Sequence, residues 1–414
     1  MRSLIMFELK KIVSRRVTQV AVGGLFALLV LVFALNVLQQ TAIDDAGERA
    51  SGLAAIALEK ERAEADAGIV TDEKATEDIR AFQRFFNDEG EIDERFASED
   101  FADPESAHAY MTKHYAYLDT ILRPWMNGSQ PIDAVAPRVD ASQTVALYDQ
   151  VAASMQAKLV ESTSPWAYSE AEQEFWMQKH ADAPKPVEYG YAGGWGDILA
   201  CVNFLFFAIV AACVAAAPVF AAEYQEKTDA VVLATRHGKG KLVAAKIAAS
   251  LLFATAVFAL YAVVAVGVPL AFFGAEGAGL PLQGSRLSIP YDVTMAQAVG
   301  VCIGVAYLVT LGMTALALLL SAKLRSPLGI FAICVAVILL PMFLPTMPSG
   351  LANHLLYLLP INAIDYANLF ANFVSYRLGL VVLDMQAVVV AAYVVLMALA
   401  IPLAARAFRR HQVL

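Results

Sequence analysis

Six long apolar segments constrain the fold of this chain more than any other feature. A hydrocarbon core about 30 Å thick requires about 20 apolar residues for one helical crossing. No segment has a charged residue at its centre, and with 58% hydrophobic and 17% charged residues, one soluble core could not bury the apolar surface. We therefore predict an all-α polytopic membrane protein with about six transmembrane helices. The predicted spans lie near residues 17–38, 198–222, 243–273, 296–320, 327–346 and 379–405.

Basic residues alternate between the loops that join these segments. Outside residues 40–197, 15 of the 17 Lys and Arg residues precede the first span, follow the last, or lie in or next to two of the connections. The loops on the other side carry only Arg286 and Arg377. Since basic loops remain in the cytoplasm, we expect a multi-pass protein of the cell membrane with both termini cytoplasmic. The first segment is too long for the apolar part of a signal peptide, so we expect it to be retained as an anchor.

The segment from Gln40 to Asp197 differs in composition from the rest of the chain. It holds 31 of the 39 acidic residues and 13 of the 30 basic ones, so its net charge is −18 and that of the remainder is +9. A polar insert of this length is a domain rather than a loop. We therefore divide the chain into residues 1–39 (a cytoplasmic amphipathic helix and the first span), 40–197 (an acidic extracytoplasmic domain) and 198–414 (spans two to six, with a cytoplasmic segment at 223–241).

We expect the acidic domain to be mainly helical and to have its own core. Residues 48–86 lack proline and mix helix-forming Ala, Glu, Lys and Arg with apolar residues, which favours helix. All four cysteines lie in predicted spans, so no disulfide can stabilise this domain. Its many aromatic residues favour a hydrophobic core over a ligand-stacking surface. They are Phe82, Phe85, Phe86, Phe96, Phe101, Tyr110, Tyr115, Trp125, Trp166, Phe175 and Trp176.

No pattern of catalytic or metal-binding residues stands out. The carboxylates between Asp88 and Glu94 lack the alternate spacing and the terminal Glu of a calcium loop, which favours a solvated acidic surface. The chain has no HExxH, GxSxG or GxxxxGK[ST] sequence. Asn36, Asn203 and Asp384 lie near the outer ends of spans, where hydration at the interface explains them. We therefore expect no catalytic residue, cofactor or metal in this chain.

The connection after the second span has a distinctive order. Acidic residues open it, apolar residues fill its middle and basic residues beside two glycines close it. These are Glu223 and Glu226, then Val231, Val232 and Leu233, then Arg236 to Lys241. A short helix over about 228–235 would have an acidic residue in its first turn and Arg236 at its end, both favoured by the helix dipole. A basic cytoplasmic loop would explain the Lys and Arg residues but not the apolar middle.

This arrangement resembles the membrane subunits of ABC-2 type exporters, permeases that work with a separate ATP-binding cassette protein. In that family the second span ends in a Glu, followed by an acidic stretch, a Leu-rich helix, a Ser/Thr-Arg pair and a Lys that opens the third span. The matching residues are Glu223, Thr228, Leu233, Thr235 with Arg236, and Lys246. The sequence from Phe7 to Arg16 is similar to the amphipathic first helix of such permeases. The resemblance covers about 1–40 and 198–414, and implies short outer helices between Pro345 and Arg377.

The resemblance implies a half-transporter whose own chain needs no catalytic side chain. A second copy or a related permease would complete the pathway among membrane lipids, and two cassette ATPase subunits would bind ATP and Mg²⁺ beneath it. No nucleic acid partner is expected, and the exported substrate, whether a peptide, a lipid-like or a drug-like molecule, is not identified. The residues expected to couple this chain to the ATPase are Glu223, Thr228, Val231, Val232, Leu233, Thr235 and Arg236.

Two other classes of protein fit parts of the pattern. A membrane-anchored receptor or scaffold would act through the extracytoplasmic domain and would need no coupling segment. An intramembrane enzyme would need acidic or histidine pairs inside the spans, which the sequence does not suggest. A cassette ATPase that co-purifies with the chain would favour the exporter over both.

Overall fold

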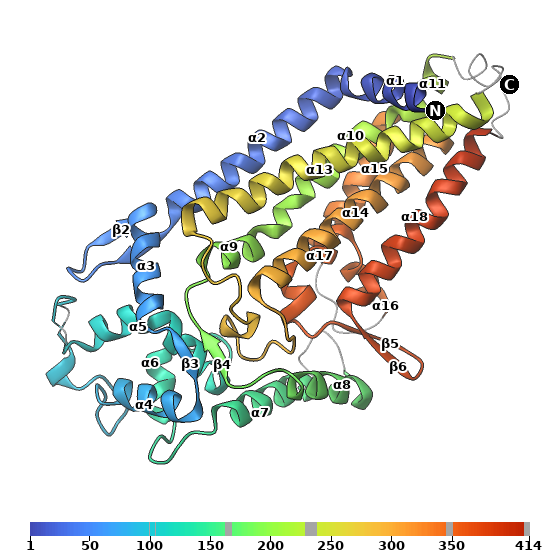
Figure 1. Ribbon diagram of the computed structural model, residues 1–414. Helices are drawn as coiled ribbons and strands as arrows, with labels where there is room; N and C mark the ends of the chain where they lie inside the picture. Colours follow the sequence, from blue (N-terminus) through green and yellow to red (C-terminus); the bar gives the residue numbers. More distant parts are fainter. Residues whose placement is uncertain (99, 104, 162–167, 228–237, 345–350, 410–414) are drawn as a thin grey trace. The chain divides into compact units, whose positions relative to one another are not determined.

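The computed structural model describes residues 1–98, 100–103, 105–161, 168–227, 238–344 and 351–409, and it is mostly helical (Figure 1). The chain forms two compact units. Unit 1 comprises Met1–Phe33, Ala200–Val268 and Gly300–Leu414, and unit 2 comprises Ala34–Leu199 and Pro269–Val299. Unit 2 therefore takes in residues 269–299, which the sequence analysis had grouped with the spans.

Unit 1 is a bundle of long helices that run alongside one another, with α1, α11 and the last turns of α18 at the same end (Figure 1). Its short strands β5 and β6 pair in antiparallel fashion, Ser375 opposite Asp384. The elements are α1 (Arg2–Val13), α2 (Arg16–Gln39), α10 (Phe206–Ala216), α11 (Pro218–Gln225), α13 (Val243–Phe273), α14 (Met295–Lys323), α15 (Pro327–Leu339), α16 (Leu351–Tyr357), α17 (Pro360–Ala363), β5 (Ser375–Leu378), β6 (Val381–Asp384) and α18 (Met385–Arg409).

Local sequence signals explain where several of these helices begin. The hydroxyl of Ser326 accepts the backbone N–H of Gly329 at 3.2 Å, and Pro327 occupies the first position of α15, where its missing N–H costs nothing. The carboxylate of Asp384 accepts the N–H of Ala387 at 3.0 Å at the start of α18. The short helices α16 and α17 lie where the family resemblance implied them.

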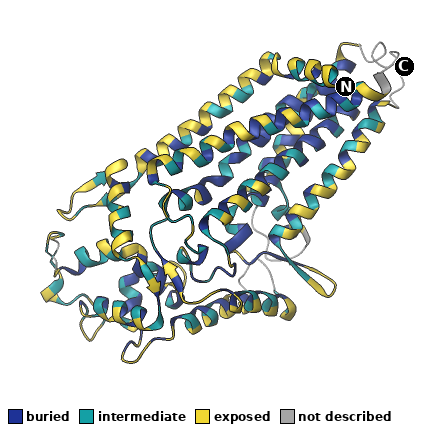
Figure 2. Ribbon diagram, in the orientation of Figure 1, coloured by how far each residue is buried: buried dark blue, intermediate teal, exposed yellow. Residues whose placement is uncertain are grey.

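Five helices in the described part of the chain are long and apolar enough to cross a membrane. The remaining predicted span, the fifth along the chain, contains a shorter apolar helix, Pro327–Met342. Their exposure differs: 72% of the apolar window of the second long helix is buried, against 17% for the first and 22% for the last. Figure 2 shows the same contrast between the dark α10 and the largely exposed α2. The five helices are Arg16–Gln39, Gly193–Gln225, Gly240–Phe273, Met295–Lys323 and Met385–Arg409.

Unit 2 is also mainly helical, with two short antiparallel strand pairs. β1 pairs with β2, and β3 pairs with β4 with Gly68 opposite Tyr189. Its elements are β1 (Thr41–Ile43), β2 (Arg49–Ser51), α3 (Leu53–Ala65), β3 (Gly68–Val70), α4 (Asp72–Gln83), α5 (Ala107–Leu122), α6 (Ile132–Val135), α7 (Leu147–Val160), α8 (Glu170–Ala181), β4 (Val187–Tyr189) and α9 (Gly193–Cys201).

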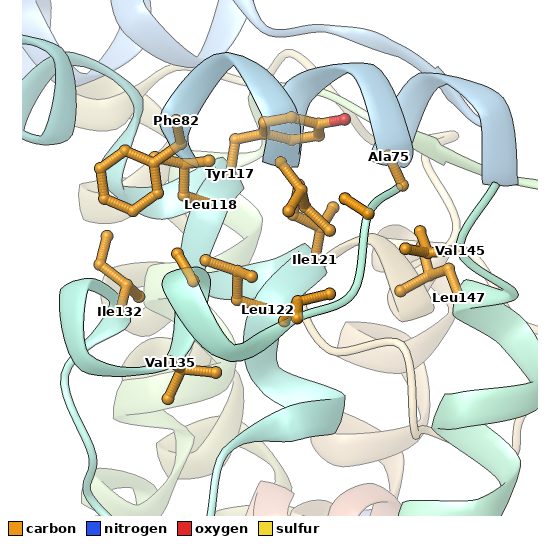
Figure 3. Packing of buried hydrophobic residues seen from close by; sticks show 14 of the residues in the cluster. Ala75, Phe82, Tyr117, Leu118, Ile121, Leu122, Ile132, Val135, Val145 and Leu147 are labelled. Atoms are coloured by element: carbon orange, nitrogen blue, oxygen red, sulfur yellow. The ribbon is translucent and has the colours of Figure 1, made fainter. Parts of the chain in front are cut away.

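The core of unit 2 is a cluster of buried apolar side chains from α4, α5, α6 and α7 (Figure 3). Phe82 and Phe85 are fully buried in it, and Phe86, Phe96, Tyr110 and Trp125 pack against it. Leu287, from the segment 269–299, is buried in the same cluster, which explains why that segment belongs to unit 2. Most of the predicted core aromatics are thus confirmed. Tyr115 is 54% exposed and is not a core residue, and Trp166 lies outside the described residues.

The helical expectation for residues 48–86 was only partly right. The structure has two helices, α3 and α4, separated by β3. Gly68 adopts a positive φ of 152°, which favours glycine, and the Thr71 hydroxyl accepts the N–H of Lys74 at 3.1 Å to begin α4. The strand between them is stabilised by pairing with β4, more than 100 residues away in sequence. Composition could not reveal that partner.

Candidate functional site

A buried ion network lies where α1, α11 and the start of α13 meet. The ammonium group of Lys246 donates to Glu223 at 2.8 Å and to Glu8 at 3.0 Å. The side chains of Lys246, Glu223 and Glu8 are 1%, 5% and 6% exposed. Lys11, which is 35% exposed, donates to the same oxygen of Glu223 at 2.8 Å. The four charges cancel, and this pairing makes their burial tolerable.

The two central charges belong to helices on either side of the coupling segment. Lys246 lies in α13, one turn after the helical turn Gly238–Leu242 that leads into it, and Glu223 lies in the last turn of α11. Their ion pair joins α11 to α13, and so connects the residues that precede and follow the segment 224–245.

The amino-terminal helix α1 joins this network through one face. Glu8 and Ile12 are buried on that face, and Lys11 adjoins them at helical spacing. The opposite face presents Met6 and Phe7, which are 57% and 65% exposed. A helix thus occupies Arg2–Val13, and its polar side chains hold it to the ends of two apolar helices.

Arg15 lies beside the network, in the connection between α1 and α2. Burial lowers the pKa of its guanidinium, and the nearby charges of Glu223, Glu226 and Glu8 act in the opposite direction. One guanidinium nitrogen, Nη1, is buried and has no hydrogen-bond partner among the described residues. The carboxylates thus attract Arg15 without satisfying all of its donors.

Ser321 of α14 supports the helix that carries Glu223. Pro218 breaks the apolar helix between α10 and α11, because a proline has no N–H to donate. The Ser321 hydroxyl accepts the N–H groups of Phe220 and Ala221, both at 3.0 Å, and donates to the carbonyl of Ala217 at 2.7 Å. It therefore caps the first turn of α11 from a different helix.

Two aromatic contacts and one hydrogen bond hold the rest of α11. The ring of Phe408, in α18, packs against Phe220 at 4.7 Å and Tyr224 at 5.8 Å between ring centroids. The Tyr224 hydroxyl donates to the carbonyl of Ala322 at 3.0 Å. α11 is thus packed against α14 and α18, while its Glu223 reaches α1 and α13.

The structure describes only part of the predicted coupling segment. Glu223 is buried in the ion network, and Lys246, which the resemblance placed at the opening of the third span, is its partner. The other residues expected to couple to an ATPase lie outside the described residues: Thr228, Val231, Val232, Leu233, Thr235 and Arg236.

Two polar residues assigned to interfacial hydration have protein partners instead. The Asn36 amide donates to the carboxylate of Asp197 at 2.6 Å within unit 2. Within unit 1, the Asn203 amide donates to the carboxylate of Asp365. Hydrogen bonds between helices offset the cost of placing amides there.

Sequence reasoning missed Glu8 and Ser321. Glu8 is the only acidic residue before the first span, and it stands among Lys10, Lys11 and Arg15 at helical spacing, a signal that could have suggested a buried pair. Ser321 gives no comparable signal, since its partners lie about 100 residues earlier in the chain.

Comparison with known proteins defines the class. Residues 18–404 match the ABC-2 family transporter proteins. This range contains the acidic segment 40–197, which the sequence analysis had left outside the resemblance. No curated protein and no solved structure matched the chain. Because the match covers nearly the whole chain, the protein belongs to the ABC-2 family of transporter membrane proteins.

Family membership fixes the general nature of this chain. ABC-2 membrane proteins lack ATPase activity themselves, generally pair with ATPase subunits and normally carry no cofactor. In the described part of the chain, no three His, Cys, Asp or Glu side chains are placed to hold a metal ion. The ion network joins α1, α11 and α13 through paired charges.

Proposed function

We propose that this chain is the membrane-spanning permease subunit of an ATP-driven exporter, and that residues 223–241 couple it to a separate cassette ATPase. The observation that supports this most directly is the ion pair between Glu223 and Lys246. It joins the two helices that flank the coupling segment, so a force on that segment reaches both helices together. The exported substrate stays unassigned.

The network also explains how such a force would spread. Glu8 and Lys11 connect α1 to the same pair, and Ser321 connects α11 to α14. When ATP draws two cassettes together, the segment of residues 228–236 would move with them. The buried ions would then transmit that movement to α1, α11 and α13 as one group, since separating them would leave a buried charge unpaired.

In this proposal the chain crosses the membrane six times, with Pro327–Met342 as the fifth crossing and both termini in the cytoplasm. Those 16 residues extend about 24 Å as a helix, a little less than the hydrocarbon thickness. The acidic unit 2 would then lie outside the cytoplasm. The low burial of α2 and α18 leaves apolar surface for membrane lipids and for a second permease copy or a related permease.

The coupling role is tested by placing charge in the apolar middle of the segment. Val232→Asp/Leu233→Asp should abolish recovery of the ATPase with the permease in detergent and coupled ATP hydrolysis in vesicles. A few desolvated side chains dominate most interfaces, and unpaired charge in their groove is costly. Membrane insertion should be unchanged, because both substitutions are in a connection outside the predicted spans.

The matched control changes charge at the edge of the same segment. Lys239→Gln/Lys241→Gln should weaken recovery only slightly and in a salt-dependent manner, as expected of charges at the rim of an interface. Normal binding and turnover in the double Asp variant would refute coupling through this segment. That result would favour the alternative of a membrane-anchored receptor or scaffold that acts through unit 2.

A further inference from the structure

Unit 1 has a large groove beside the ion network, with a volume of about 830 Å³. Three stretches of helix form its walls: the first turns of α2, the junction of α10 and α11, and the start of α15. Volumes of 300–1,000 Å³ are typical of sites for small organic ligands. The lining residues that matter for the argument are Arg15, Arg16, Ala21, Val214, Leu328 and Phe331.

The groove is apolar along its walls. Apart from Arg15, Arg16 and Thr18, every lining residue is aliphatic, aromatic or proline. Val17, Val20 and Leu328 are 72%, 74% and 76% exposed, although they belong to helices of a membrane-spanning bundle. Apolar residues this exposed at the end of a spanning helix are suited to contact with hydrocarbon.

The two arginines give the groove an anion-binding end. They are adjacent in sequence and lie between α1 and the first span. Both line the groove, and Arg16 is exposed. Guanidinium groups bind phosphate oxygens through geometrically matched hydrogen bonds.

We propose that this groove binds an anionic phospholipid, with an acyl chain between α2, α10 and α15 and the phosphate at Arg15 and Arg16. Both parts of the site contribute to the assignment. Free phosphate would use the arginines and leave the apolar walls in water. A neutral lipid would cover the walls but would offer no anion to the exposed Arg16.

Such a lipid would stabilise the region that the coupling segment acts on. Arg15 faces the carboxylates of Glu223 and Glu8, and Pro218 contributes to both the groove and the start of α11. A ligand that binds only the folded protein raises its stability, and the increase grows with the logarithm of the ligand concentration relative to Kd. The proposal does not depend on the ATPase and can be tested on the purified chain.

The test is thermal unfolding of the delipidated full-length protein in detergent, titrated with phosphatidylglycerol, phosphatidylcholine or inorganic phosphate. Phosphatidylglycerol should raise the melting temperature in a saturable way, and native mass spectrometry should show retained lipid. Arg16→Gln should weaken this binding about fivefold, the effect of one basic residue near a membrane surface. Val214→Phe and Ala21→Phe, on opposite walls, should block it by filling the groove.

Arg406→Gln is the matched control, because Arg406 is an exposed arginine at the same end of the bundle that does not line the groove. It should bind phosphatidylglycerol as the unaltered protein does. Equal stabilisation by phosphatidylcholine, or full binding in both groove-filling variants, would overturn the proposal. Stabilisation by phosphate alone would do the same, as would a protein-concentration dependence showing that a second copy of the chain covers the groove.

Discussion

Lys246 carries a buried ammonium group whose charge is balanced by two carboxylates. Its side chain is 1% exposed, and because a buried charge is costly unless it is paired, its contacts with Glu8 and Glu223 matter for the fold. Glu8 is 238 residues away in sequence and Glu223 is 23. The pairing therefore contributes specificity to the fold, since it fixes which helices meet at this end of unit 1.

Removing the central cation should destabilise the protein more than removing the half-exposed one. Lys246→Met leaves two buried carboxylates with too few partners, and the expected loss is about 3 kcal/mol of unfolding free energy. Lys11→Gln should cost about 1 kcal/mol or less, because solvent can replace that interaction. Unfolding in mixed micelles measures both changes.

Lys323→Gln serves as the control for charge at this end of the bundle, since Lys323 is exposed and is not part of the network. It should leave stability nearly unchanged. A double variant, Glu8→Gln/Lys246→Met, should be less destabilised than the sum of the single variants if the pair is coupled. Simple additivity would mean that the two residues do not act together.

The resemblance to ABC-2 permeases singled out Glu223 and Lys246 from sequence, but not the contact between them. Glu8 was in a segment quoted for its amphipathic pattern, and its burial depends on α1 packing against α11 and α13. Local periodicity predicts the face of a helix and not the identity of its partner. This is why the residue types were predicted and their network was not.

At the scale of elements, the second apolar segment shows what hydropathy leaves out. Its composition predicted one span, and the structure has one long apolar helical stretch there, Gly193–Gln225, in which α11 begins at Pro218. The Ser321 hydroxyl accepts two N–H groups in the first turn of α11. A proline inside an apolar run signals a kink, but the group that compensates for it comes from α14.

Ser321→Ala should therefore destabilise the α10 to α11 junction. Two buried N–H groups lose their acceptor, at a cost of about 2 kcal/mol. Pro218→Ala restores a helical donor, so the double variant Pro218→Ala/Ser321→Ala should recover part of that loss by forming a more regular helix.

Ser250→Ala is the control, since the buried Ser250 hydroxyl donates to the carbonyl of Lys246 in its own helix and does not cap another helix. Thermal unfolding of the four variants in detergent makes the comparison, and equal losses for Ser321→Ala and Ser250→Ala would contradict the capping role.

At the scale of the whole molecule, composition alone separated an apolar part from an acidic part. Mean hydropathy and net charge are averages over tens of residues, so they can be calculated from the sequence without knowing the fold. The assignment of residues 269–299 to unit 2 was not readable in this way. It depends on individual contacts, such as the burial of Leu287 and the ion pair between Lys60 and Glu276. The ion pair alone joins residues that are 216 apart in sequence.

The proposed orientation predicts which positions an impermeant thiol reagent reaches. Ser129→Cys and Ser285→Cys introduce exposed cysteines in the two parts of unit 2, and both should be labelled in intact cells. Gly238→Cys, in the basic connection, should react only after lysis. The four native cysteines are buried, so the background should be low. Labelling of Gly238→Cys in intact cells would reverse the orientation, and labelling at only one of Ser129→Cys and Ser285→Cys would show that the two parts of unit 2 are not on one side of the membrane.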